Sequence, residues 1–75
     1  MIEREPQTPE GWLFTLDDRG RRRGFLAGIA DLQTAKLWVM QIVPDGRDIR
    51  ADPLPLGLEK YGLLKGRIIE STSPN

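Results

Sequence analysis

Two sharp turn signals divide this sequence into short segments and so limit the length of every regular element between them. The first is Asp17-Asp18-Arg19-Gly20, in which glycine supplies the positive φ that many tight turns need. The second is Val43-Pro44-Asp45-Gly46-Arg47, in which proline presets φ and glycine accepts the exit angle. Short segments bounded by such turns predict short strands and a mainly β protein.

The segments on either side of the first turn predict a hairpin. Apolar residues alternate with others over 12–16 and again over 21–29, which is typical of strands. Gly24 and Gly28 lie inside the second segment, where glycine marks a bulge, a bend or the close approach of another chain. Strongly bent strands are what a small closed barrel requires.

The segment 31–43 admits either a helix or a strand. As a helix it would begin after a capping Asp31 and carry apolar residues at helical spacing to Ile42. As a strand it would use the continuous apolar run at 37–43, which holds β-branched and aromatic residues and ends at the second turn. The shortness of that run favours the strand, which leaves room for a short helix near 31–36, and the helix that runs to Ile42 is the alternative.

The fold expected from these segments is a small five-stranded barrel or rolled antiparallel sheet of SH3-like or OB-like type. A short strand continues at 49–51, and residues 63–70 form the last strand. Residues 52–57 cannot form a central strand, because Pro53 and Pro55 cannot donate to the ladder, and we expect an extended connection there. We expect one domain over 11–70, a flexible N-terminal arm at 1–10 and a disordered tail at 71–75.

The residue types in the chain exclude most catalytic and metal sites. The 75 residues include no Cys and no His, which excludes thiolate nucleophiles, Ser-His-Asp triads and ordinary zinc sites. Asp45, Asp48 and Asp52 lack the alternate ligands and the terminal glutamate of an EF-hand loop. No phosphate-loop or dinucleotide glycine motif is present. We therefore expect a protein that is not an enzyme and uses no metal or cofactor.

Charge and size bear on the class of partner. Eleven basic and eleven acidic residues give a net charge of zero, which indicates no strongly acidic or basic partner. No apolar run approaches the roughly 18 residues of a membrane span, and the N-terminus lacks the apolar core of a signal peptide, so we expect a soluble cytoplasmic protein without membrane contact. A chain this small has a thin margin of stability, and self-association is one way to bury more surface.

The apolar run at 37–43 leads to the preferred function, a non-catalytic binding module that acts through protein–protein contact and self-associates as a homo-oligomer. One side of an all-apolar strand meets the core, and the other must meet a partner. We take Trp38 and Met40 as candidate partner-binding residues. The hairpin-tip residues Arg21, Arg22 and Arg23 would form a polar recognition edge.

Nucleic-acid binding is the alternative, because Arg19-Gly20-Arg21-Arg22-Arg23 places four arginines within five residues. Arginine binds phosphate with two parallel hydrogen bonds and stacks on bases. Trp12 and Phe25 lie close by in the sequence and could stack on unpaired bases. The zero net charge favours the protein-contact interpretation, since nucleic-acid domains usually carry a basic excess.

Two segments resemble part of a known family. Tyr61-Gly62-Leu63-Leu64-Lys65-Gly66-Arg67-Ile68-Ile69 is similar to the motif that opens a barrel strand in HlyD-type membrane fusion proteins, the periplasmic adaptors of type I secretion. Val39-Met40-Gln41-Ile42-Val43-Pro44-Asp45-Gly46 resembles the stretch that precedes that barrel. The resemblance covers about half of the chain and lacks the family's anchor, coiled coil and biotinyl-like halves. It implies barrel strands, with Gly62 and Gly66 at constrained backbone positions, and no adaptor role.

Overall fold

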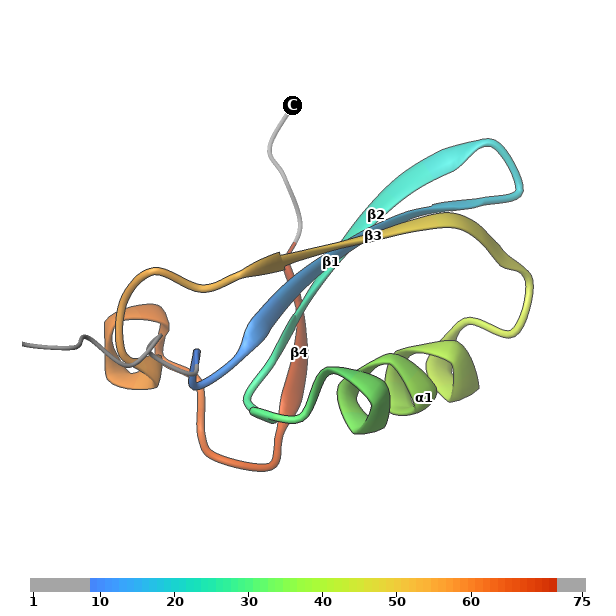
Figure 1. Cartoon of the computed structure of the whole chain (residues 1–75). Helices are drawn as coiled ribbons and strands as arrows, with labels where there is room; N and C mark the ends of the chain where they lie inside the picture. The colour runs from blue at the N-terminus through green and yellow to red at the C-terminus, as the bar shows by residue number, and fades with distance from the viewer. Residues whose placement is uncertain (1–8, 72–75) are drawn as a thin grey trace, which may run out of the picture.

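The computed structural model describes residues 9–71, which form a four-stranded sheet with one helix packed against it (Figure 1). The elements follow the order β1 (Trp12–Asp18), β2 (Arg21–Ala27), α1 (Leu32–Ile42), β3 (Gly46–Pro53), a short 3₁₀ helix η1 (Leu58–Tyr61) and β4 (Ile68–Ser71). The predicted arm at 1–10 and tail at 71–75 lie outside the described residues except for Pro9, Glu10 and Ser71.

The expected hairpin is present. β1 and β2 pair in regular antiparallel register from Trp12 with Ala27 to Asp18 with Arg21. The connecting residues Arg19 and Gly20 have φ values of 53° and 84°. Two successive positive φ values define the tight turn whose twist matches that of the flanking strands. The turn signal in the sequence is therefore confirmed.

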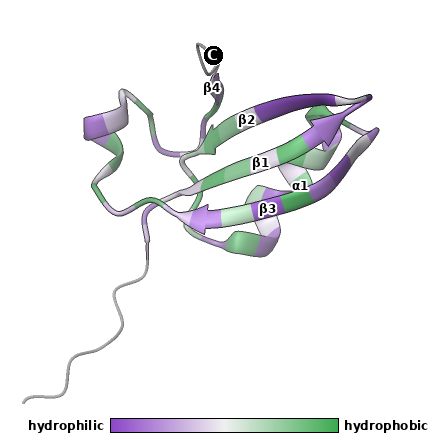
Figure 2. Cartoon of the chain, turned by 90° about the horizontal axis from the view of Figure 1, so that it is seen from above, coloured by the Kyte–Doolittle hydropathy of each residue, from purple (hydrophilic) through white to green (hydrophobic). Residues whose placement is uncertain are grey.

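The prediction of a mainly β fold is confirmed, but the five strands and the closed barrel are wrong. The sheet has the order β3-β1-β2-β4 with antiparallel neighbours throughout, so β3 and β4 remain separate edges. A fifth strand is missing from residues 9–71 because the segment expected to supply it forms α1. The helix connects β2 to β3 across one face of the sheet (Figures 1 and 2).

α1 begins with a side-chain cap. Asp31 has extended backbone geometry, and its carboxylate accepts hydrogen bonds from the Thr34 N–H at 2.9 Å and the Thr34 hydroxyl at 2.6 Å. Such a cap satisfies a backbone donor that the first turn leaves without an intrahelical partner. The strand preferred for 37–43 is therefore wrong, and the alternative of a helix that begins after Asp31 and runs to Ile42 is confirmed.

The core lies between α1 and the sheet. Phe14 and Phe25 face each other across β1 and β2, and Ala35 and Val39 pack from the helix; all four are almost fully buried. Small helix residues let the helix approach the two aromatic rings closely. Within residues 9–71, the opposite face of the sheet has no helix over it (Figure 2).

The C-terminal segment is attached to β2 through Gly28. The Gly28 N–H donates to the Arg67 carbonyl and the Gly28 carbonyl accepts from the Gly66 N–H, both at 2.7 Å. A Cβ at Gly28 would collide with the carbonyl oxygen of Leu64. Gly28 therefore lies just after β2 rather than inside a strand, and close approach of another segment is the one of its three expected roles that the structure shows.

Candidate interaction surface

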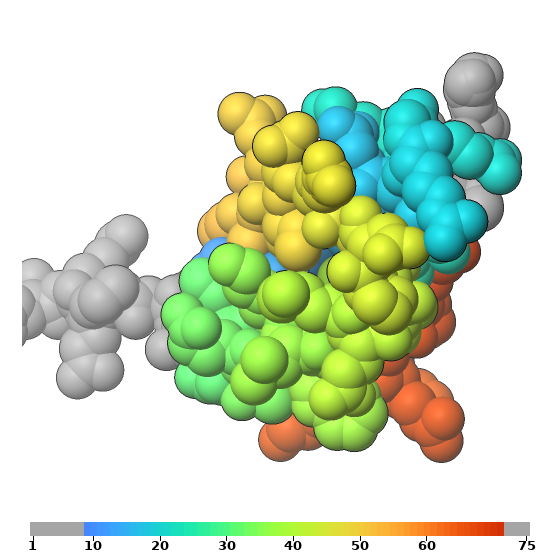
Figure 3. All heavy atoms as spheres, turned by 90° about the vertical axis from the view of Figure 1, so that its right-hand side faces the viewer, coloured from blue at the N-terminus to red at the C-terminus, as the bar shows by residue number. Residues whose placement is uncertain are grey.

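α1 carries four large apolar side chains that are exposed: Leu37 and Met40 face away from the sheet, Trp38 lies at the flank, and Ile42 lies at the C-terminal end of the helix. Leu37 is 61% exposed, Trp38 54%, Ile42 48% and Met40 43%. We call these four residues the α1 outer surface. Figure 3 shows α1, in green and yellow-green, forming the lower half of one side of the molecule. In helices of globular proteins the side that faces away from the core normally carries charged and polar residues.

The helix carries almost no charge. Lys36 is the single charged residue between Leu32 and Ile42, and the remaining exposed polar residues are Gln33, Thr34 and Gln41. The inner side of the helix is already packed against the sheet, because Ala35 and Val39 are completely buried there. The apolar residues on the outer side are therefore a surplus that the packing of residues 9–71 does not use.

The residues predicted to bind a partner lie on this surface, although not on a strand. Trp38 and Met40 are both exposed members of α1, and neither belongs to the buried core cluster. Leu37 and Ile42 belong to the same surface but were not singled out in the sequence. The absence of charge from Leu37 to Val43 is the signal that could have identified them.

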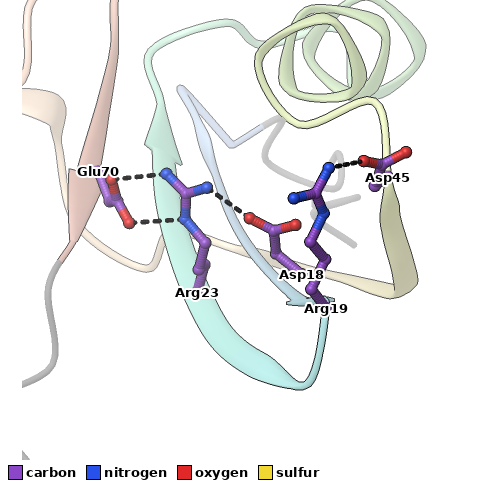
Figure 4. A network of polar contacts seen from close by, with 5 residues as sticks. All are labelled: Asp18, Arg19, Arg23, Asp45 and Glu70. Atoms are coloured by element: carbon purple, nitrogen blue, oxygen red, sulfur yellow. Dashed lines mark hydrogen bonds and ion pairs between the residues drawn. The ribbon is translucent and has the colours of Figure 1, made fainter.

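Ion pairs within the chain fix the arginines of the hairpin tip (Figure 4). Arg23 donates from Nε and Nη2 to the two carboxylate oxygens of Glu70, at 2.9 and 3.0 Å, and from Nη1 to Asp18 at 2.8 Å. The hydrogen bonds that Arg23 donates to Glu70 and Asp18 raise the pKa of Arg23, and the bonds that Glu70 accepts from Arg23 lower the pKa of Glu70. This network joins β1, β2 and β4.

Two more tip arginines also face carboxylates. Arg19 Nη2 lies 3.0 Å from Asp45 Oδ2, and Arg22 Nη1 lies 3.7 Å from Asp17 Oδ1. Arg21 has no ion-pair partner within 4.0 Å among residues 9–71. Most of the positive charge at the tip is therefore neutralised locally.

The two aromatic residues of the alternative site are not presented beside the arginines. Phe25 is buried in the core, with the Arg23 guanidinium 5.2 Å from its ring centre. Trp12 lies at the far end of β1 and donates its Nε1–H to the Ala30 carbonyl at 2.9 Å. The structure thus brings the tip arginines together but does not give them an exposed stacking platform.

The tip and the α1 outer surface meet at a shallow pocket of about 180 Å³. Ile42 from the end of α1 lines it together with Arg19 and Arg23 from the hairpin. Apolar and charged side chains therefore adjoin at the C-terminal end of the helix, where an apolar surface passes into a polar rim.

A groove of about 620 Å³ lies at the opposite end of the sheet. Its walls are formed by Trp12, Glu10 and the proline-rich stretch 53–57, with Pro9 completing them. Within residues 9–71 no three acidic residues are grouped closely enough to hold a metal ion. No helix in this range is long and apolar enough to cross a membrane.

No model of a protein family, no curated protein and no solved structure matches this chain. The resemblance to HlyD-type proteins therefore stays a prediction. Residues 39–42 of the first segment are helical, and the second segment includes the end of η1 at Tyr61 and the first residues of β4, Ile68 and Ile69. Gly62 and Gly66 do have positive φ values, 67° and 81°.

Proposed function

We propose that this protein is a non-catalytic binding module that acts through protein–protein contact and self-associates. The observation that carries the proposal is the α1 outer surface, a set of four large apolar side chains on a helix whose inner side is already packed. Contiguous apolar surface rimmed by polar residues is typical of protein interfaces.

Association is energetically favourable because it would cover apolar surface that α1 leaves exposed. Full burial of a large apolar side chain contributes about 1.5–3 kcal/mol. Each of the four side chains is about half exposed, so covering them adds roughly 1 kcal/mol per residue. For a chain of this size that sum is comparable to the whole stability of the fold, about 3–5 kcal/mol.

In this proposal, the arginines of the hairpin tip form the polar edge of the interface. Arg19 and Arg23 adjoin Ile42 at the shallow pocket, and their carboxylate partners hold them in fixed directions. Interfaces commonly combine an apolar centre with a charged rim that selects the partner and its orientation. Arg21 and Arg22 extend this edge along β2.

Sedimentation velocity tests the proposal, with concentrations from about 1 μM to about 1 mM. We expect the sedimentation coefficient of the wild type to rise with concentration. A Trp38→Ser/Met40→Ser variant should remain monomeric over the same range.

The matched control is Leu56→Ser/Leu64→Ser, which removes two apolar side chains from outside α1 that are 55% and 70% exposed, at least as exposed as Trp38 and Met40. The control should associate like the wild type. Equal loss of association in both variants would show a general solubility effect and contradict the proposal, as would a wild type that stays monomeric throughout.

A titration with labelled single-stranded RNA and DNA separates this function from the nucleic-acid alternative. Because the tip arginines are mostly paired, we expect fluorescence anisotropy to detect no binding at about 0.15 M salt. Micromolar binding that weakens with salt, and whose salt dependence falls when Arg21, Arg22 and Arg23 are changed to Ala, would establish the alternative instead.

A further inference from the structure

The groove beside Trp12 is separate from the α1 outer surface and from the hairpin tip, and the proposed function does not use it. It lies where β1 begins and β3 ends, at the end of the sheet that carries η1 (Figure 1). We propose that this groove binds a basic segment of a partner protein, whose arginine or lysine side chain contacts both Trp12 and Glu10. The inference rests on the size of the groove, on its ordered walls and on its charge.

The groove has the size and the lining of a site for a few residues of a peptide. Its volume of about 620 Å³ falls within the range of ligand pockets, about 300–1,000 Å³. Apolar residues form most of its walls, and Trp12, Leu54 and Leu56 are the largest of them. Such walls can cover the aliphatic stem of a long side chain and leave its charged end at the rim.

The walls are held in place before any ligand binds. The Trp12 Nε1–H donates to the Ala30 carbonyl at 2.9 Å, which fixes the orientation of the indole ring. The Leu54 N–H donates to the Gly11 carbonyl at 3.1 Å, and two prolines restrict φ in the stretch 53–57. Walls that are already ordered lose less conformational entropy on binding.

The charge of the groove selects the ligand. Among the described residues that line it, Glu10 alone is charged. The Glu10 Oε1 accepts a hydrogen bond from the Leu58 N–H at 3.2 Å, which holds the carboxylate beside η1. No arginine or lysine of residues 9–71 lies within 4.0 Å of this carboxylate. A carboxylate without a counter-ion and the face of an indole both attract a cation.

A basic protein segment fits these features better than other classes of ligand do. Phosphate groups of a nucleic acid or an anionic lipid would be repelled by Glu10. A wholly apolar peptide would remove water from the Glu10 carboxylate without giving it a partner. A guanidinium group can stack on the indole ring and donate hydrogen bonds to the carboxylate at the same time.

Two-dimensional ¹⁵N–¹H NMR tests the proposal at a fixed protein concentration, so that self-association does not change during the titration. The probe is the peptide acetyl-Ser-Leu-Arg-Leu-Ser-amide. The control peptide carries citrulline, which has nearly the shape of arginine without its charge. We expect the arginine peptide to shift the indole signal of Trp12 and the amide signals of residues 54–57 with a Kd of roughly 100 μM to 1 mM. The citrulline peptide should bind at least about threefold more weakly.

The variant Glu10→Gln keeps the oxygen that accepts from Leu58 and removes only the charge. It should keep the fold and bind the arginine peptide at least about threefold more weakly than the wild type does. The matched control, Asp48→Asn, removes a negative charge from an exposed position of β3 whose positive φ suits asparagine, and it should bind like the wild type.

Four results would overturn the inference. They are no shift at Trp12 up to roughly 5 mM peptide, equal affinity for the arginine and citrulline peptides, an unchanged affinity in Glu10→Gln, and an equal loss of affinity in Asp48→Asn. Each of them leaves the proposed self-association through α1 standing, because that function is tested by sedimentation without any peptide.

Discussion

Replacement of Gly28 by alanine tests how the C-terminal segment is held to the sheet. The added Cβ would overlap the Leu64 carbonyl oxygen and approach Leu63 Cγ to 3.3 Å. To relieve the overlap, residues 63–67 must move away from the end of β2. The movement would break the two hydrogen bonds that Gly28 makes with Gly66 and Arg67 and expose Leu63, which is 3% exposed in the wild type.

The magnitude follows from these contacts. Two backbone hydrogen bonds contribute about 0.5–1.5 kcal/mol each, and the burial of a leucine about 1.5–3 kcal/mol. We expect Gly28→Ala to lower the free energy of unfolding by about 3 kcal/mol or more, most of the stability of a chain this small. Urea unfolding followed by circular dichroism at 222 nm measures it.

Gly57→Ala is the matched control. Gly57 has a φ of −67°, and a Cβ there would have no neighbour closer than 3.8 Å. The alanine restricts the unfolded chain without strain in the folded one, so this variant should be unchanged or up to about 1 kcal/mol more stable. If the free energy of unfolding of Gly28→Ala lies within about 0.5 kcal/mol of the wild-type value, the close attachment of residues 63–67 to the end of β2 is refuted.

Three further substitutions test other parts of the fold. Asp31→Ala removes the cap of α1 and should lower the melting temperature by several degrees, as measured by circular dichroism. Arg19→Asn suits the positive φ before Gly20 and should raise stability by less than about 1 kcal/mol in urea unfolding, since the exposed Arg19–Asp45 pair contributes little. The pKa of Glu70 is lowered by its hydrogen bond from Arg23, so its stabilising effect is complete above the ordinary glutamate pKa and disappears as the pH falls through the lowered value. Glu70→Gln should therefore lose less stability than the wild type between neutral and acid pH.

The local elements of the fold were predictable where a short pattern has one meaning. The turn at Arg19 and Gly20 and the hairpin around it follow from apolar alternation and turn chemistry. At Gly28 the sequence indicated a bulge, a bend or a close approach, and the structure shows the close approach just beyond the end of β2. Mainly β structure followed from these same signals.

The helix was one of two interpretations that the sequence left open, and the continuous apolar run at 37–43 favoured the strand instead. Leu37 to Ile42 carry the β-branched and aromatic residues of a strand, and the exposed ones obscure the helical spacing of Ala35 and Val39. The cap formed by Asp31 and Thr34 was the signal that should have outweighed the composition. Because residues 37–43 were assigned to a strand, the prediction had five strands and a closed barrel. The structure has four strands in an open sheet.

The candidate surface was identified by composition but on the wrong element. Trp38 and Met40 are exposed because the small residues Ala35 and Val39 fill the contact with the sheet. The tip arginines were recognisable, but their partners Glu70 and Asp45 lie 47 and 26 residues away from Arg23 and Arg19. Pairing across such separations depends on the strand order, which no local pattern determines.

The most direct measurement is a series of two-dimensional ¹⁵N–¹H NMR spectra recorded as the concentration is raised from about 10 μM to about 1 mM. The account predicts concentration-dependent shifts or broadening confined to residues 33–42 and the adjoining hairpin tip, with the open face of the sheet unaffected. Spectra that do not change with concentration, or changes centred on Leu13, Leu26 and Ile69 of the open sheet face, would contradict it.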